Sequence, residues 1–347
     1  MFDPALSFYD RAGLATNYGI GPAVSAVVTN TQDSGPGSLR TAMYYGFDHP
    51  GTTITFGIPT SDSGFSNNVF TIQPTDRLPS LVNGTTIDGT TEPTNSNPDG
   101  PSIVLNGSSA TLPDVFANGL HFSGSNCTVR ALVVNGWNGS GVAIEGTNTT
   151  GNTLAGCYIG TDPAGTSAVS NGFCGVLIDL GAHANTVGGT GLGDGNLISG
   201  NAYQGIVVRG TGVTQNAVFG NIIGLNAAGT AAVPNTYEGV AIDSGAASNT
   251  VGSVLGRNVI SGNHAQGIAI RDPGSDANVV EGNYIGLNGA GTDGISNFFA
   301  GIEISGGARS TLIGGASAGN VIAGNGAQGI VIFGTNTDGT VIQANTI

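Results

Sequence analysis

The sequence predicts an all-β solenoid in which three short parallel strands make each coil. The first observation is a long internal repeat, because the segment that begins at Gly205 recurs at Gly267, 62 residues later, and Ile260 recurs at Ile322 with the same offset. A fixed period of this size is typical of stacked repeat architectures. The second is that glycine, with 61 of 347 residues, separates short apolar runs. Strands this short bury an apolar face only when successive coils stack on one another.

The regular part of the chain is predicted to span residues 119–347, with about eight coils, the last of them incomplete. Asn-x-[Val/Ile/Leu] segments, such as 185–187 and 196–198, supply two further strands in each interval between glycine-led strands. In the strand that follows Gly205, Ile206 and Val208 point inward and the alternate residues point outward. The glycine-led strands have the form Gly-[Ile/Val]-x-[Ile/Val/Phe] and begin at Gly119, Gly141, Gly175, Gly205, Gly239, Gly267, Gly301 and Gly329.

Two kinds of insertion explain why the repeat contains two coils. One kind lies between the second and third strands of alternate coils, and the other follows the third strand of the remaining coils, so two rows of loops are expected on different edges. Asparagines also recur in register, as Asn221 does with Asn283 and Asn201 with Asn263, and Gln204 recurs in the same way. Stacked amides of this kind are predicted to bond one coil to the next. The insertions are 188–195, 252–257 and 314–319, and 160–173, 224–238 and 286–299.

The first third of the chain is less regular. Residues 1–27 show no periodicity and are predicted to be an arm or linker, and Asp3 and Asp10 leave no visible signal peptide. Residues 28–118 are predicted to form an N-terminal cap and the first irregular coils. A short amphipathic helix is expected over 38–45 with Ser38 as its N-cap. Strands are expected over 52–58, 68–74, 85–89 and 102–107.

Composition excludes several classes of function. A net charge of −14 argues against a nucleic-acid partner, which needs clustered cations. No apolar run approaches the roughly 18 residues of a membrane span. Cys127, Cys157 and Cys174 lack metal-type spacing and are expected to be buried thiols, although one disulfide remains an alternative. The chain ends within a coil, which suggests continuation in a longer chain or end-to-end self-association.

The repeat text GNYIGLNGAGT, the NVISGN segments and the leader VTNTQDSGPGSLRTAM resemble the right-handed parallel β-helix family with pectin-lyase-like (PbH1) repeats. The resemblance covers roughly residues 26–347. Members of this family are found in large bacterial extracellular and surface proteins. The resemblance therefore implies a right-handed parallel β-helix, a helix that caps the first coil, and an extracellular or cell-surface location. It does not identify an activity, because the fold hosts lyases, hydrolases, epimerases, adhesins and stalks.

A polar register follows the glycine-led strands and is the main candidate site. Five consecutive coils place a charged residue there, and the signs alternate in part, so stacking at about 4.8 Å predicts a ladder of ion pairs. A structural ladder is the favoured interpretation, and a ligand-binding stripe is the main alternative. The register reads Ser123, Glu145, Asp179, Arg209, Asp243, Arg271, Ser305 and Phe333.

The candidate ligand-binding set consists of the five charged members of this register together with Trp137, the only tryptophan, as a sugar-stacking platform or else a residue buried against a turn. A catalytic interpretation would use Asp179 and Asp243, about 9–10 Å apart across two coils, near the carboxylate spacing of inverting glycosidases. A lyase interpretation would use Arg209 or Arg271 as the base. Arg209 between two carboxylates argues against both roles, because each charge stabilises its neighbour in the ionised form.

No cofactor is predicted. Asp162, Asn226 and Asn288 share a loop register and are weak candidates for Ca²⁺ ligands. The preferred function is a non-catalytic extracellular surface, stalk or adhesion module that binds a polysaccharide or cell-surface glycan along the face of the glycine-led strands. The alternative is a polysaccharide-active enzyme, either a lyase or an inverting glycoside hydrolase, with its groove on that face.

Overall fold

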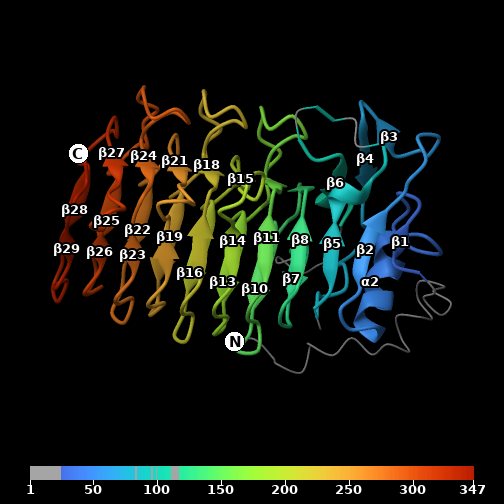
Figure 1. Ribbon diagram of the computed structural model, residues 1–347, viewed down its shortest axis with the longest axis horizontal. Coiled ribbons are helices and arrows are strands. Elements are labelled where there is room, and N and C mark those ends of the chain that lie inside the picture. The colour runs from blue at the N-terminus through green and yellow to red at the C-terminus, as the bar shows by residue number, and fades with distance from the viewer. Residues whose placement is uncertain (1–24, 83, 95–96, 99, 111–116) are drawn as a thin grey trace.

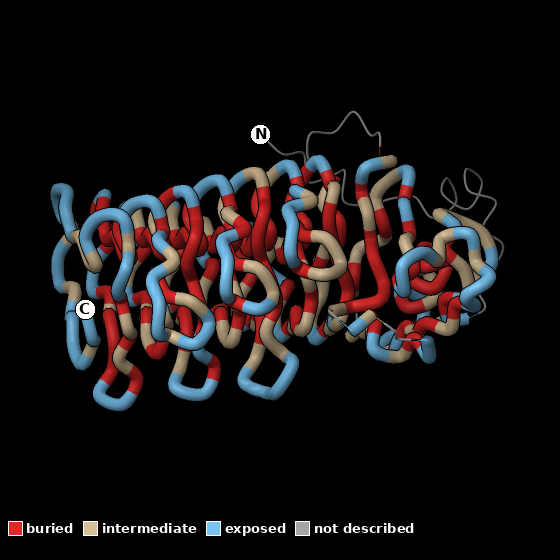
Figure 2. Tube along the Cα trace, turned by 90° about the horizontal axis from the view of Figure 1, so that it is seen from above, coloured by how far each residue is buried: buried red, intermediate tan, exposed pale blue. Residues whose placement is uncertain are grey.

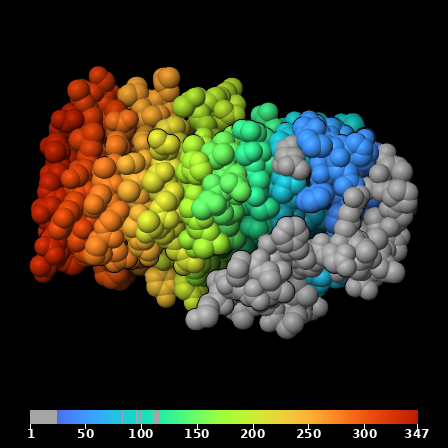
Figure 3. All heavy atoms as spheres, turned by 90° about the horizontal axis from the view of Figure 1, so that it is seen from below, coloured from blue at the N-terminus to red at the C-terminus, as the bar shows by residue number. Residues whose placement is uncertain are grey.

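The computed structural model describes residues 25–347 apart from 83, 95–96, 99 and 111–116, and it is a parallel β-helix with three strands per coil (Figure 1). The predicted fold class is confirmed. The coils follow one another along a single axis, so that the chain runs from one end of the molecule to the other (Figure 3). The predicted arm, residues 1–27, lies almost wholly outside the described residues.

The first sheet is formed by the glycine-led strands, which pair in parallel and in the predicted register. Each strand begins one residue after a predicted glycine. Its strands are β7 (Leu120–Phe122), β10 (Val142–Glu145), β13 (Val176–Asp179), β16 (Ile206–Arg209), β19 (Val240–Asp243), β22 (Ile268–Ile270), β25 (Ile302–Ile304) and β28 (Ile330–Ile332).

The second sheet follows the first in each coil and extends furthest toward the N-terminus. Its first strands confirm the segments predicted over 52–58 and 85–89. Its strands are β1 (Val27–Val28), β2 (Thr53–Phe56), β5 (Thr86–Asp88), β8 (Thr128–Arg130), β11 (Thr153–Ala155), β14 (Thr186–Gly188), β17 (Ala217–Phe219), β20 (Thr250–Val251), β23 (Val279–Val280), β26 (Leu312–Ile313) and β29 (Val341–Ile342).

The third sheet completes each coil. It holds the one antiparallel strand pair of the described residues, between β3 and β4, and β3 was not predicted from the sequence. Its strands are β3 (Phe65–Ser66), β4 (Val69–Ile72), β6 (Ile103–Asn106), β9 (Leu132–Asn135), β12 (Tyr158–Ile159), β15 (Leu197–Ile198), β18 (Ile222–Ile223), β21 (Val259–Ile260), β24 (Tyr284–Ile285) and β27 (Val321–Ile322).

A helix covers the first coil, as expected. α2 (Leu39–Asp48) begins after Ser38, whose side chain accepts a hydrogen bond from the Thr41 amide. Leu39, Ala42 and Met43 are buried against the N-terminal end of the interior. The helix therefore closes the apolar column that the first coil would otherwise expose. Two short 3₁₀ turns, η2 (Gly89–Thr91) and η3 (Gly107–Ser109), follow strands of the irregular coils.

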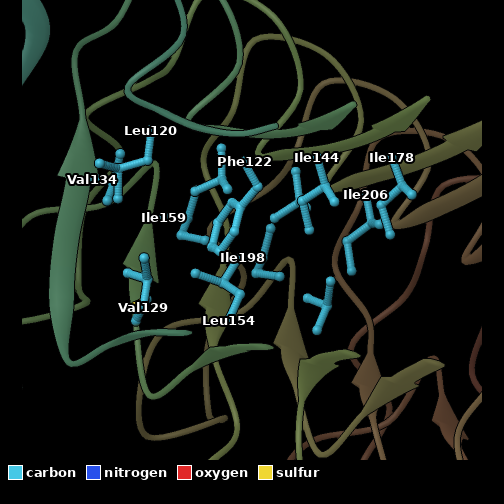
Figure 4. Close-up of a cluster of buried hydrophobic side chains, with 14 of the residues drawn as sticks. Leu120, Phe122, Val129, Val134, Ile144, Leu154, Ile159, Ile178, Ile198 and Ile206 are labelled. Carbon is cyan, nitrogen blue, oxygen red and sulfur yellow. The ribbon is translucent and has the colours of Figure 1, made fainter. Parts of the chain in front are cut away.

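The interior is a continuous column of aliphatic side chains. In Figure 4 the labelled residues of all three sheets, such as Phe122, Ile159 and Ile198, point toward one another. The outer surface of the loops is exposed, whereas the strands are buried along most of the length (Figure 2). Burial of this column supplies the main stabilising free energy, because each strand alone is too short to persist.

Three ladders of buried asparagine run along the corners of the β-helix. In the corner before the third sheet, Asn196, Asn221 and Asn258 bond in series, each side-chain amide donating to the next side-chain oxygen. The same oxygen also accepts from the preceding asparagine's backbone N–H. The two predicted asparagine ladders are therefore present, and each includes more residues than the sequence suggested. The members are Asn196, Asn221, Asn258, Asn283, Asn320 and Asn345; Asn171, Asn201, Asn235, Asn263, Asn297 and Asn325; and Asn152, Asn185, Asn216, Asn249 and Asn278.

The two predicted rows of loops lie on different edges. The longer loops follow β12, β18 and β24 and project at the upper edge of Figure 1. They are two coils apart and still touch, because the Ala227 amide donates to the Gly165 carbonyl at 2.9 Å and the Gly289 amide to the Gly229 carbonyl at 2.8 Å. The shorter loops connect the second and third sheets in the intervening coils.

Candidate functional site

The outer face of the first sheet presents two columns of side chains, which we call the middle column and the terminal column. The strand pairing places both columns in register from coil to coil. The terminal column is the polar register predicted from the sequence. The middle column reads His121, Ala143, Leu177, Val207, Ala241, Ala269, Glu303 and Val331.

The terminal column does not form the continuous ion-pair ladder that was expected. Arg209 bonds to Asp179 through Nε and Oδ2 at 2.8 Å. Arg271 instead turns away from Asp243 and binds Glu238 and Glu303, the latter through Nε and Oε1 at 3.2 Å. The expectation of alternating pairs was wrong here because carboxylates outside the column offer Arg271 two partners at once.

Glu238 and Glu303 are the site residues that the sequence interpretation missed. Both are largely buried, whereas the side chain of Arg271 is 31 % exposed. Gln204 donates to Glu238 and Gln266 to Glu303, so the glutamines predicted to stack on one another bind carboxylates instead. The sequence did contain a signal for both residues. Glu238 replaces a glutamine in the series that includes Gln204 and Gln266, and Glu303 replaces an apolar residue in the middle column.

Two small residues of the middle column, Ala241 and Ala269, explain how the side chain of Arg271 reaches across the sheet. Earlier coils carry Leu177 and Val207 at the equivalent positions of the middle column. A methyl group leaves room above the strand for a long side chain, which then links the terminal column to the opposite side of the face. The burial of both alanines is consistent with this arrangement.

A row of aromatic rings lines that opposite side. Phe173 and Tyr203 have centroids 5.1 Å apart, and Tyr203 and Tyr237 stack at 5.2 Å with an interplanar angle of 25°. Tyr203 and Tyr237 remain 42% and 44% exposed. Phe299 occupies the equivalent position two coils after Tyr237 and meets the exposed Phe298 edge-on at 4.9 Å. We call Phe173, Tyr203, Tyr237 and Phe299 the aromatic row.

At the N-terminal end of the face, His121 lies between Ser80 and Glu145. The Ser80 hydroxyl is 2.9 Å from His121 Nδ1, and Glu145 Oε2 is 3.2 Å from Nε2. The second pair is close but poorly aligned, so Nε2 lacks a well-formed hydrogen bond. When Nδ1 accepts from the Ser80 hydroxyl, the ring proton lies on Nε2, the nitrogen that faces the Glu145 carboxylate.

Asp243 differs from its neighbours because no basic side chain bonds to it among the described residues. Burial raises the pKa of the Asp243 carboxyl, and the nearby Asp272 carboxylate adds to the rise. The Ser244 hydroxyl, which donates to Oδ1 at 2.9 Å, and the charges of Arg209 and Arg271 oppose that rise without cancelling it. Arg209 thus lowers the pKa of Asp243 as expected, but burial outweighs that effect.

Asp243→Asn should stabilise the protein at pH 7. A carboxyl whose pKa is raised by folding contributes stability below its unfolded pKa and loses it as the pH rises through the folded pKa. The gain from the substitution should therefore shrink on acidification and vanish below about pH 3.8, the ordinary value for this group. Thermal unfolding of both proteins across this pH range measures the difference.

Asp179→Asn is the matched control, because it removes an ion-paired carboxylate from the same column. It should destabilise the protein by about 1 kcal/mol at pH 7 through loss of the charged partner of Arg209. If Asp243→Asn were instead the more destabilising of the two at pH 7, the proposed environment of Asp243 would be incorrect.

Trp137 does not offer a sugar platform. Its side chain is 1% exposed, and its indole N–H donates to the Leu105 carbonyl at 3.2 Å. Its backbone amide bonds to Asn171, so the residue occupies the first position of an asparagine ladder. The assignment of Trp137 to ligand binding was wrong, because the ring fills the corner between the third and first sheets.

The three calcium candidates use their side-chain oxygens to close their own loops. Asp162 accepts from the amides of Thr166 and Ser167, and Asn226 accepts from those of Thr230 and Ala231. Asn288 closes its loop in the same way. Among the described residues no group of three or more His, Cys, Asp or Glu side chains converges on a common point. These contacts account for the shared register as loop capping.

The three cysteines are buried and free, and no disulfide joins them. Burial raises the pKa of Cys157 and of Cys174 to about 12, which keeps both thiols protonated at neutral pH. The described segments contain no helix with the length and hydropathy of a membrane span.

Comparisons with known proteins give structural likeness only. No protein-family model and no curated sequence matches the chain. Two similar solved structures are the A-modules of the mannuronan C-5 epimerases AlgE4 and AlgE6 of Azotobacter vinelandii, at 13% and 14% identity with TM-scores of 0.40 and 0.36. Each alignment covers 95% of this chain and 99% of the other. An alginate lyase from Paenibacillus sp. str. FPU-7 aligns at 12% identity and TM-score 0.23, over 92% of this chain and 99% of that one.

Proposed function

We propose that the first-sheet face binds an extracellular polysaccharide or cell-surface glycan, and that the β-helix acts as a non-catalytic surface, stalk or adhesion module. The observation that carries the proposal is the link between the aromatic row and the charged cluster. Tyr237 presents an exposed ring, and the next residue, Glu238, bonds to Arg271 from the terminal column. Ring faces and planar polar groups thus lie on one continuous surface.

This combination suits a carbohydrate. An exposed tyrosine ring packs against the apolar face of a sugar while its hydroxyl remains hydrated. The carboxylate, guanidinium and amide groups of this face already hold one another in place. Hydrogen bonds from these groups to the hydroxyls of a sugar therefore cost little side-chain conformational entropy. Carboxylates outnumber the two arginines on this face, because Arg271 binds two of them and Asp243 has no ion pair among the described residues, so the face favours a neutral glycan over an anionic one. Stacked coils also repeat these groups at about 4.8 Å, which suits an extended chain.

Tyr203→Ala and Tyr237→Ala should each weaken glycan binding by roughly fivefold to thirtyfold, because each removes a stacking surface worth about 1–2 kcal/mol. A glycan array identifies a binding polysaccharide, and titration calorimetry with that polysaccharide measures the loss. Phe47→Ala is the matched control, since Phe47 is an exposed aromatic residue of α2 at the N-terminal end. Equal affinity of the two tyrosine variants and the natural protein for the glycan would contradict the proposal.

Polysaccharide cleavage is the second candidate function, and Asp243 is the observation that favours it. A carboxyl with a raised pKa and no ion pair has the character of a general acid, and Asp179 lies in the same column two coils away. Incubation of the bound glycan with the protein should release no new reducing or unsaturated ends if the module only binds. Release that Asp243→Asn abolishes would replace the binding proposal with the enzymatic one.

A further inference from the structure

A cavity lies over the outer face of the second sheet. Its volume is about 390 Å³, within the range of small-ligand sites. It is lined by residues of β8, β11 and β14, by the loop 189–194 and by Phe219 of β17. None of these residues belongs to the first-sheet face.

A break in one outward column creates this cavity. In that column Arg130 and Phe219 are large, whereas the two coils between them carry Ala155 and Gly188. The gap therefore spans three coil spacings, about 14 Å between the strands that hold the large residues. Parallel to it, Thr128, Thr153 and Thr186 form a column of hydroxyls in strand register.

The loop 189–194 forms a wall of the cavity. The Gly156 amide donates to the Asp194 carbonyl at 2.9 Å, and the Gly191 amide donates to Asp194 Oδ2 at the same distance. These contacts hold the Asp194 carboxylate at the cavity. The insertion that distinguishes alternate coils thus supplies a functional group as well as a surface.

Arg130 gives the cavity its selectivity. Its side chain is exposed, and it makes no ion pair with any residue in the described part of the chain, although Asp88 is its neighbour in strand register and Asp194 lines the same cavity. An exposed guanidinium without an ion-pair contact keeps its N–H donors available to an anionic ligand. The nearby Asp194 disfavours a doubly charged phosphate, so a single carboxylate fits best.

We propose that this cavity binds a carboxylated sugar, with the carboxylate on Arg130, the ring hydroxyls on the threonine column and Asp194, and an apolar ring face against Phe219. The site is independent of the first-sheet face and of the function proposed for it. It would hold one sugar residue, free or as a branch of a larger chain.

Titration calorimetry of the full chain with glucuronate tests the proposal, with glucose and glucose 6-phosphate as probes of the same size. Glucuronate should bind at least tenfold more tightly than either, because only it offers one carboxylate for the guanidinium. Its affinity should fall with added salt, as expected for a partly exposed ion pair. Absence of glucuronate binding, or equal binding of the three sugars, would overturn the proposal.

Two variants locate the site. Arg130→Gln should reduce glucuronate affinity about tenfold, to the level of glucose, and Ala155→Leu should block binding by filling the gap. The column already accepts large side chains at Arg130 and Phe219, so Ala155→Leu is expected to fold, and Arg130→Gln alters only an exposed side chain. Tyr203→Ala, on the first-sheet face, should leave glucuronate binding unchanged. Undiminished binding in both cavity variants would place the ligand elsewhere.

Discussion

Asn221→Ala is expected to destabilise the protein by roughly 3–6 kcal/mol, because it interrupts a buried ladder. The Asn221 amide donates to the Val187 carbonyl at 2.9 Å and to Asn258 Oδ1 at 3.0 Å. Its oxygen accepts from both the backbone and the side chain of Asn196. Alanine leaves these groups in a dry corner without partners, and each buried orphan costs about 1–3 kcal/mol.

Asn226→Ala is the control for this substitution. Asn226 is also an amide that accepts backbone hydrogen bonds, but its loop is exposed and water replaces the lost contacts. Its replacement should cost less than about 1 kcal/mol. Chemical denaturation monitored by circular dichroism compares the two variants, and a comparable cost for both would show that the buried ladder contributes little. Because repeat proteins can unfold in stages, midpoints at more than one wavelength should be compared.

Gly188→Ala is expected to destabilise the protein by more than about 4 kcal/mol. Gly188 has φ +92°, and a Cβ placed on it would lie 1.8 Å from the Phe219 carbonyl oxygen. That oxygen belongs to the next coil and accepts a hydrogen bond from the Gly189 amide at 2.9 Å. Relief of the clash therefore requires separation of two coils whose spacing is fixed by strand pairing.

Gly193→Ala isolates the contribution of the close contact. Gly193 has φ +82° in the same loop, but a Cβ there would meet nothing within 4 Å. Only the left-handed backbone conformation is penalised, at about 1–2 kcal/mol. Thermal unfolding of the two variants should therefore show a much smaller loss for Gly193→Ala. If the losses were equal, backbone conformation rather than coil contact would determine the requirement for glycine.

The fold could be predicted because its local signals repeat. The coils from Gly119 onward repeat the glycine-led strand, and most of them repeat the asparagine corners, so each coil supports the prediction made from the one before. The ladders were underestimated for a specific reason: Asn196 and Asn258 precede strands and resemble ordinary turn residues. Only the structure shows that their amides point inward and bond in series.

The candidate site was harder to predict. Strand register determines which residues are neighbours, but it does not determine which of several partners a long side chain binds. The sequence places Arg271 beside Asp243, and the residues immediately before them, Ile270 and Ile242, are paired in the strands. The side chain nevertheless crosses the sheet to Glu238, because Ala241 and Ala269 leave the path open. Trp137 likewise gave no sign of its burial, which depends on Gly107 and on a corner formed by separate coils.

The contact between successive long loops constrains how this molecule can change in length. The loop amides of Ala227 and Gly289 reach the carbonyls of Gly165 and Gly229 across two coils, so the intervening coil must keep a short turn on that edge. Duplication of one long-loop coil would place a second long loop in the space over the intervening coil, which the contacts between the present loops already fill. Duplication of a pair preserves the spacing. The two-coil segment is therefore the unit by which the β-helix can lengthen while it keeps the contacts between its long loops.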